Sequence, residues 1–129
     1  MNIGIVPDPT HSPDWPKIEA FLEPAAKLGG VPVLEPLEEV WTAVEGGDLF
    51  AAATARLTND GLGEVVLVGG RDRKRWLAQL DQQLGRWFKM EGRRAMRAYG
   101  RKGWTRELEK LGWSVIGEKG GVTAYEKVL

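Results

Sequence analysis

The chain contains no cysteine and only one histidine among its 129 residues. Without cysteine it can form no disulfide, no thiolate nucleophile and no cysteine-ligated metal site, a pattern that fits a reducing interior. His11 alone cannot build a multi-histidine zinc site, and it is weak support for a histidine-based catalytic triad. We therefore expect no metal, and we expect His11 to be solvated within its proline-rich loop.

Long apolar segments are also missing from the sequence. Nowhere do about eighteen apolar residues run together, which is the length that a membrane-spanning helix needs. Residues 1–8 have neither the basic start nor the apolar stretch of a signal peptide. These features predict a cytoplasmic protein, and 129 residues with 43% hydrophobic side chains predict one domain with a genuine core.

The net charge of zero conceals a strong asymmetry along the chain. Residues 1–70 carry three Lys or Arg against eleven Asp or Glu, whereas residues 71–110 carry thirteen against five. The basic segment could attract a nucleotide cofactor, nucleic acid or an acidic partner surface. Alternatively, the two halves neutralise each other or simply solvate two helix faces.

The first part of the chain predicts a strand and a helix. Residues 2–6 are short and rich in isoleucine and valine, which is typical of a strand. Apolar residues then recur at helical spacing until the glycines 29–30, with Ser12 and Pro13 placed as a capping pair. Pro24 within this helix predicts a kink or a break, because proline donates no backbone hydrogen bond.

A second helix is predicted to open at Pro36 and to end at the glycines 46–47. Its apolar residues fall at i, i+3, i+4 and i+7, the spacing of one helix face: Leu37, Val40, Trp41 and Val44. Residues 48–58 are apolar and alanine-rich, and by periodicity alone they fit a strand or a helix. The turn signal at 58–61 and the β-rich run after it favour a hairpin.

The second half begins with the clearest helix, over residues 72–91, with Asp72 as its expected N-cap. A short buried strand is predicted at 95–99, followed by a helix that Thr105 caps. Residues 114–128 predict a final hairpin, because two β-rich runs flank a Lys-Gly-Gly turn.

An apolar run ends at the glycine pair 69–70, directly before the basic helix. A strand that stops at such a pair and leads into a helix is a common phosphate site, because the first N–H groups of the helix are free. The sequence therefore predicts an anion-binding site at this junction.

The succession and the local motifs of these elements resemble the GNAT superfamily of acyl-CoA N-acyltransferases. Residues 106–113, Arg-Glu-Leu-Glu-Lys-Leu-Gly-Trp, resemble the family's Phe-Tyr-Glu-Lys-Leu-Gly-Phe element. More narrowly, the segments 68–72, 96–104 and 125–127 resemble small GNAT-like proteins of tailed phages and prophages. The resemblance covers residues 36–129 and, mainly by the pattern of elements, residues 1–35.

This resemblance implies one GNAT-like domain over residues 1–129, an α/β (α+β) fold with a mixed, mostly antiparallel sheet flanked by helices. It also implies that the fourth and fifth strands, near 64–69 and 95–99, are parallel neighbours that separate and hold the pantetheine arm of acetyl-CoA between them. The implied cofactor-binding residues are Leu67, Val68, Gly69, Gly70, Arg71, Arg73, Lys74 and Arg75. The loop is degenerate for pyrophosphate, because the family's spaced glycines are absent and Asp72 adds a negative charge.

The resemblance also implies catalytic roles for three residues. Glu64, at the start of the fourth strand, is the candidate general base. The family's usual acid is a tyrosine where this chain has Leu108, so Tyr99 or Tyr125 is the candidate that protonates the leaving thiolate. Each residue could instead have no catalytic role. Glu64 would then be an exposed residue at a strand end, and the tyrosines would be packed residues at the sheet edge.

Three functions remain open from the sequence. The first is acetyl transfer from acetyl-CoA to an amine. The second is a non-catalytic structural or assembly role in a phage particle, with a vestigial cofactor cleft and phage proteins as partners. The third is nucleic-acid binding through the basic segment 71–110, and its candidate contacts are Arg86, Lys89, Arg93, Arg94, Arg97, Arg101 and Lys102.

Overall fold

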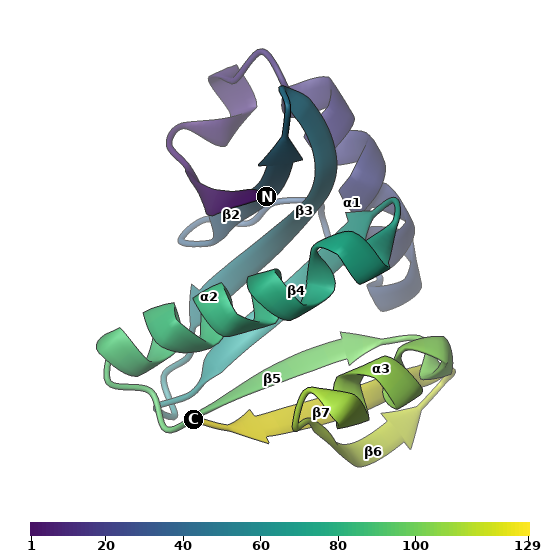
Figure 1. The fold of residues 1–129 in the computed structure, drawn as a ribbon. Coiled ribbons are helices and arrows are strands. Elements are labelled where there is room, and N and C mark those ends of the chain that lie inside the picture. The colour runs from purple at the N-terminus through teal and green to yellow at the C-terminus, as the bar shows by residue number, and fades with distance from the viewer.

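A computed structural model describes all of residues 1–129, which form one seven-stranded mixed sheet (Figure 1). The strand order is β1-β2-β3-β4-β5-β7-β6, and every neighbouring pair is antiparallel except β4 and β5. The strands are β1 (Asn2–Val6), β2 (Glu39–Glu45), β3 (Asp48–Leu57), β4 (Gly63–Gly70), β5 (Ala95–Gly100), β6 (Ser114–Lys119) and β7 (Val122–Val128). The expected single α/β domain with a mostly antiparallel sheet is confirmed.

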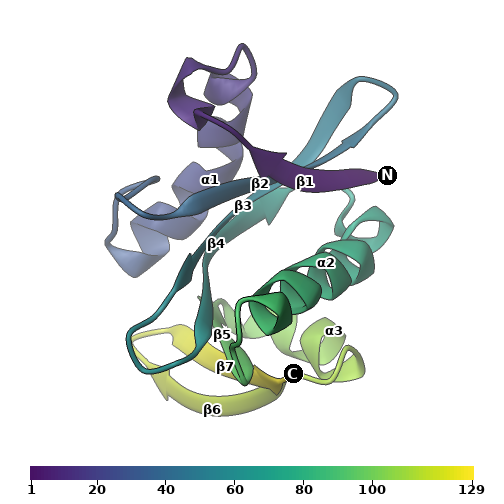
Figure 2. The same cartoon turned by 90° about the vertical axis from the view of Figure 1, so that its left-hand side faces the viewer.

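Three helices cover the two faces of the sheet (Figure 2). The helix α1 (Trp15–Gly29) lies on one face, and α2 (Leu77–Met90) and α3 (Thr105–Lys110) lie on the other. Two apolar clusters correspond to these faces, a smaller one around α1 and a larger one that includes residues of α2 and α3. The helices lack the length and apolar character that a membrane-spanning helix needs.

The predicted second helix is wrong, because its apolar residues form the strand β2. This strand pairs with β1 on one side and with β3 on the other. Val40 packs in the α1 cluster, whereas Trp41 packs in the α2 cluster. A strand buried on both faces shows no strict alternation of apolar and polar residues, so helical spacing arose by coincidence. The β-branched and aromatic residues of the segment suit a strand.

The first helix is predicted correctly in place but not in its cap. It begins at Trp15 with Asp14 at the N-cap, and the Ser12 hydroxyl accepts the Asp14 backbone N–H over 3.2 Å. The helix continues through Pro24, so the predicted break does not occur. Gly30 ends it in the left-handed conformation, as the glycine signal predicts.

The other two helix caps also differ from the prediction. Asp72 is left-handed and precedes a short 3-10 helix, η2 (Arg73–Arg75), so α2 begins five residues later at Leu77. Thr105 is the first residue of α3 rather than its cap, and its hydroxyl instead bonds the Tyr125 hydroxyl at 2.7 Å. Short polar residues predicted a cap in both places, but Asp72 adopts a left-handed conformation and Thr105 bonds Tyr125 across the fold.

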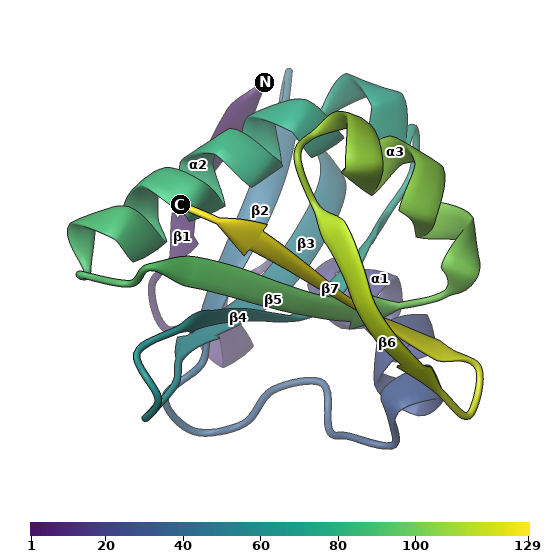
Figure 3. The ribbon, with the colours of Figure 1, turned by 90° about the horizontal axis from the view of Figure 1, so that it is seen from below.

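The strands β4 and β5 pair over only three residues and then diverge (Figures 1 and 3). The last paired position joins Val65 to Ala98, although β4 continues to Gly70. The register between β3 and β4 also slips here, because Ala55 faces Val65 and Thr54 faces Leu67, which leaves Val66 as a bulge. The expected separation of two parallel neighbours is confirmed, and the bulge marks the point where it begins.

The bulge changes which face of the sheet each β4 side chain meets. Val65 packs in the cluster of α2, whereas Leu67 packs in the cluster of α1. Residues two apart on a regular strand would share one face. The extra residue therefore turns the second half of β4 toward α1 and away from β5.

Candidate functional site

A cavity of about 630 Å³ opens where β4 and β5 diverge. Its walls come from both faces of the sheet, since α1 contributes Phe21 and Leu28 while α2 contributes Leu77 and Leu80. The cavity therefore passes between the two strands, from the α1 side to the side of α2 and α3. Its volume is in the range of small-molecule and cofactor sites.

The cavity lies along an edge of β4 that β5 leaves unpaired. Beyond Val65 and Ala98 the facing backbone groups of the two strands have no partner across the gap. Such groups can hydrogen-bond an extended ligand that carries amides, in the way that a peptide adds to a sheet edge. Of the predicted cofactor residues, Leu67, Val68, Gly69 and Gly70 line the cavity.

Packing requires the glycine pair at the end of β4. A Cβ on Gly69 would lie 1.8 Å from the Phe21 carbonyl oxygen of α1, and one on Gly70 would lie 2.4 Å from the Phe50 carbonyl oxygen. No side chain fits at either position. The glycine signal in the sequence therefore reports the close approach of α1 and β3 to β4.

The basic loop after β4 is already engaged with protein groups. Arg71 and Arg75 stack on the Phe50 ring at 4.1 and 4.6 Å from the guanidinium carbon to the ring centroid, and Arg75 also pairs with Glu45. Arg73 stacks on Trp104 at 4.7 Å and pairs with Glu107 of α3. None of these three arginines forms the cavity wall.

The end of the cavity near α2 and α3 has polar groups that sequence reasoning overlooked. Arg101 and Trp104, from the segment after β5, line this end. The basic sequence character of Arg101 signalled only a possible nucleic-acid contact, because nothing in the sequence shows that this loop folds beside β4. Lys74 forms no ion pair within 4.0 Å.

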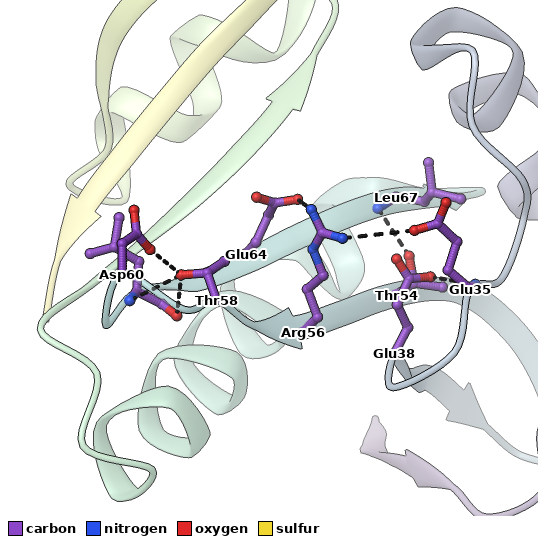
Figure 4. Close-up of polar contacts among 9 residues, drawn as sticks. Glu35, Glu38, Thr54, Arg56, Thr58, Asp60, Glu64 and Leu67 are labelled. Atoms are coloured by element: carbon purple, nitrogen blue, oxygen red, sulfur yellow. Dashed lines mark hydrogen bonds and ion pairs between the residues drawn. The ribbon is translucent and has the colours of Figure 1, made fainter.

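On the α1 side, a line of charged residues from three segments borders the cavity (Figure 4). Arg56 of β3 donates to Glu64 of β4 at 2.8 Å and lies 3.7 Å from Glu35, which precedes β2. Glu38 accepts the Glu35 backbone N–H at 3.0 Å, and its other carboxylate oxygen is buried without a partner. Burial is the main cause that raises the pKa of Glu38.

The three residues proposed for catalysis all border this cavity, but on different sides. Glu64 and Tyr99 lie close enough for the Glu64 charge to raise the Tyr99 pKa, an effect second to that of burial. Tyr99 is 44% exposed, whereas Tyr125 is 1% exposed and packs with the α2 cluster. The Tyr125 hydroxyl donates to the Arg101 carbonyl at 3.1 Å and bonds the Thr105 hydroxyl at 2.7 Å.

A buried polar contact holds the α2 wall of the cavity to the C-terminal hairpin. Asp81 of α2 accepts the Trp113 indole N–H and the Lys127 ammonium, each at 2.6 Å. Asp81 is only 8% exposed, so these two donors satisfy both of its carboxylate oxygens within the protein. This contact fixes the far wall while β4 and β5 stay apart.

Three of the seven basic residues that suggested nucleic-acid binding form contacts within the fold. Arg93 donates to the Thr58 carbonyl at 2.7 Å, Arg94 donates to the Asp60 carbonyl at 3.2 Å, and Arg97 pairs with Glu126. Trp87 packs against Trp41 with ring centroids 5.7 Å apart and against the larger apolar cluster, so it is part of the core packing. Arg93 and Arg94 therefore connect the β3–β4 turn to the start of β5, and Arg97 connects β5 to β7.

Comparison with known proteins shows what this arrangement is similar to. No protein-family model matches the sequence, and no curated protein matches it. The structure is similar to an acetyltransferase from Bacillus subtilis solved in complex with CoA, with a TM-score of 0.74, 14% identity and coverage of 99% of this chain and 98% of that one. It is also similar to an IAA acetyltransferase from Bacillus cereus, with a TM-score of 0.73, 12% identity and 99% coverage of both chains.

A third similar structure carries the family name. It is a GNAT family acetyltransferase from Elizabethkingia anophelis with acetyl-CoA bound, with a TM-score of 0.69, 12% identity and 99% coverage of both chains. Identities at this level establish the fold over the whole chain. The protein therefore has the fold of the GNAT acetyltransferases.

Proposed function

We propose that the protein transfers an acetyl group from acetyl-CoA to an amine. The observation that carries this proposal is the cavity that passes through the sheet where β4 and β5 separate. It gives a cofactor and an acceptor separate entrances on opposite faces of the sheet, with the unpaired edge of β4 between them. The CoA and acetyl-CoA bound in two structures of the same fold support the choice of cofactor.

The chain offers suitable groups for each part of acetyl-CoA. The free edge of β4 from Val66 to Val68 suits the amides of the pantetheine arm. The first i to i−4 hydrogen bond at the start of α2 runs from the Leu80 N–H to the Trp76 carbonyl. The backbone N–H groups before Leu80 in this first turn are therefore suited to bind the pyrophosphate. Lys74 and Arg101 add positive charge, and Arg73 adds more when it leaves Glu107.

Two side chains carry the proton transfers in this proposal. Glu64 accepts a proton from the acceptor amine, directly or through water, while Arg56 holds its carboxylate in place. The amine nitrogen then bonds to the acyl carbon, and the bond from that carbon to sulfur breaks. Tyr125 protonates the departing thiolate, and a solvent proton relayed through the Thr105 hydroxyl restores the Tyr125 phenol. The products are an N-acetyl amine and CoA.

Tyr125 is favoured over Tyr99 as the acid because of its position. It lies on the side of α2 and α3, where we place the cofactor, whereas Tyr99 lies beside the proposed base. We assign Tyr99 to the acceptor side of the cavity. A working site of this kind uses the cytoplasmic acetyl-CoA supply, so we place the protein in the cytoplasm.

Steady-state acetyl transfer tests these assignments. We expect Glu64→Gln to lower kcat about 100-fold or more, the usual size of a general-base contribution. Tyr125→Phe should lower kcat by at least about tenfold, and Thr105→Val, which removes the same hydrogen bond but keeps the phenol, should lower it less. Full activity in a folded Glu64→Gln variant would refute the assigned base.

The other two functions are alternatives that the same experiments separate. A non-catalytic GNAT-fold protein would bind acetyl-CoA weakly or not at all and would release no CoA with any amine. The similar structures reported above come from bacteria, and they give no support to the phage origin that the sequence resemblance implies. Nucleic-acid binding would appear as retention on DNA that falls steeply with salt.

A further inference from the structure

The α1-side entrance of the cavity has one apolar wall and one charged wall. The apolar wall comes from α1 and the segment after it, and its residues are Phe21, Pro24, Ala25, Leu28 and Val31. Val31 remains 38% exposed, so part of this apolar surface faces solvent. The charged wall consists of Glu35, Arg56 and Glu64 (Figure 4). The Tyr99 ring lies beside it.

The charged wall has a net charge of minus one, because its two carboxylates share one arginine. Arg56 is shared between Glu64 at 2.8 Å and Glu35 at 3.7 Å, so one guanidinium faces two carboxylates. Glu38 lies next to this group, since it accepts the Glu35 backbone N–H. The repulsion of Glu35 and Glu64 adds to the burial that raises the Glu38 pKa. An incoming group with a single positive charge therefore complements this wall.

The same walls disfavour two other kinds of acceptor. A polyamine or a lysine-rich peptide needs a second anionic group, but α1 contributes no charged residue to the cavity wall. The acidic Glu23 of α1 instead pairs with Lys27 at 3.3 Å and lies outside the cavity. An acidic acceptor would be repelled by the two carboxylates, and Arg56 already pairs with both of them.

We propose that the acceptor is a primary amine with one positive charge and an apolar body. Its ammonium approaches Glu64 and Glu35, and its hydrocarbon or aromatic part packs on the α1 wall and the Tyr99 ring. This inference rests on the acetyl transfer proposed above, and it names the substrate class of that site. The ammonium first releases one proton to solvent through Glu64. The neutral amine then gives a second proton to Glu64 as it gains the acetyl group, and CoA leaves as the thiol.

A series of straight-chain alkylamines tests the apolar part directly. Ethylamine, butylamine and hexylamine have nearly the same basicity, so their rates report the apolar contact and not the nucleophile. Each buried CH₂ contributes about 0.8 kcal/mol, which corresponds to about a fourfold gain in kcat/KM. Because the chain has no cysteine, a thiol reagent measures only the CoA released. We expect hexylamine to exceed ethylamine by at least tenfold and to exceed spermidine and ethanolamine as well.

Variants of the apolar wall test whether the preference for longer alkylamines arises from contact with α1. Leu28→Ser should lower kcat/KM for hexylamine several-fold and leave that for ethylamine nearly unchanged. Leu37→Ser is the matched control, because Leu37 is 96% exposed and lies outside the cavity wall. Equal loss for both amines in Leu28→Ser, or preference of the wild type for spermidine or ethanolamine, would overturn the inference.

A binding measurement separates this inference from the proposed function. If acetyl-CoA does not raise the melting temperature, the proposed function fails. If CoA does bind, hexylamine added to the CoA complex must raise the melting temperature further, and ethylamine must do so less. The absence of that second shift, with CoA bound, would refute the acceptor class alone.

Discussion

The backbone N–H of Leu67 donates to the Thr54 hydroxyl over 3.2 Å, where the pairing of β3 and β4 slips by one residue. Thr54 is fully buried, so its side chain supplies an acceptor in a place that water does not reach. A side chain thus stabilises the bulge that turns β4 away from β5. The site depends on this contact even though neither residue reacts.

Removing the Thr54 hydroxyl should destabilise the bulge. Thr54→Val keeps the shape of the side chain but leaves the Leu67 N–H without its partner, at a cost of about 1–3 kcal/mol. Urea unfolding measures this loss. Thr54→Ser keeps the hydroxyl and should lose clearly less, and equal stability of the valine variant and the wild type would contradict the role of this bond.

Packing against α1 should make Gly69 intolerant of any side chain. A Cβ there would lie 1.8 Å from the Phe21 carbonyl oxygen, which is backbone and cannot rotate away. We expect Gly69→Ala to lower the free energy of unfolding by at least about 1–3 kcal/mol. Gly117→Ala in β6 is the control, since nothing lies within 4 Å of its added Cβ, and similar losses in both variants would refute the explanation.

The buried Asp81 should contribute far more to stability than a neighbouring exposed pair. Asp81→Ala strands the Lys127 ammonium and the Trp113 indole, and breaking such a buried pair costs about 3–5 kcal/mol. Glu126→Ala, which removes the partly exposed pair with Arg97, should cost at most about 1 kcal/mol. Denaturant unfolding of the two variants compares them, and a reversed order would contradict the assignment.

The charge on Glu38 should make stability depend on pH. Burial raises its pKa in the folded state, so its contribution is present below the unfolded pKa and is lost as pH rises through the folded value. Glu38→Gln removes the charge and keeps an oxygen for the Glu35 N–H. We expect the variant to be more stable than the wild type at pH 7 and equally stable below about pH 4. Greater stability of the wild type at pH 7 would show that this carboxylate is favourably paired.

The contact between Arg73 and Glu107 should oppose cofactor binding. The pyrophosphate and Glu107 compete for the same guanidinium if the cofactor lies where we place it. Glu107→Gln should therefore tighten CoA binding several-fold, and Arg73→Ala should weaken it, in calorimetric titrations at low salt. Unchanged affinity in both variants would move the pyrophosphate to another part of the cavity.

Much of the fold could be predicted from local patterns. The hairpin of β3 and β4, the long helix α2, the strand β5 and the terminal hairpin all have strong local signals, and the structure contains them. The segment of β2 was not predictable by periodicity, because a strand between two others buries both faces and loses its alternation. The β-branched Val40 and the aromatic Trp41 indicated a strand more reliably than the spacing of the apolar residues did.

The site was harder to predict than the fold. The uniform apolar run Val65–Val68 gives no sign of the bulge at Val66, because every side chain in it suits either face. Glu64 could be singled out by its place on the strand. Its partner Arg56, and Glu35 that shares this arginine, come from segments that meet only after the sheet forms, so no local spacing could reveal them.

Titration of the protein with CoA tests whether the gap between β4 and β5 is a cofactor site. We predict one-to-one binding and a stabilisation of about 2.7 kcal/mol when CoA is in hundredfold excess over Kd, seen as a rise in melting temperature. Ala98→Phe, which places a ring in the gap, should abolish both effects in a folded protein. No heat and no shift at millimolar CoA, or full binding by the Ala98→Phe variant, would contradict the account.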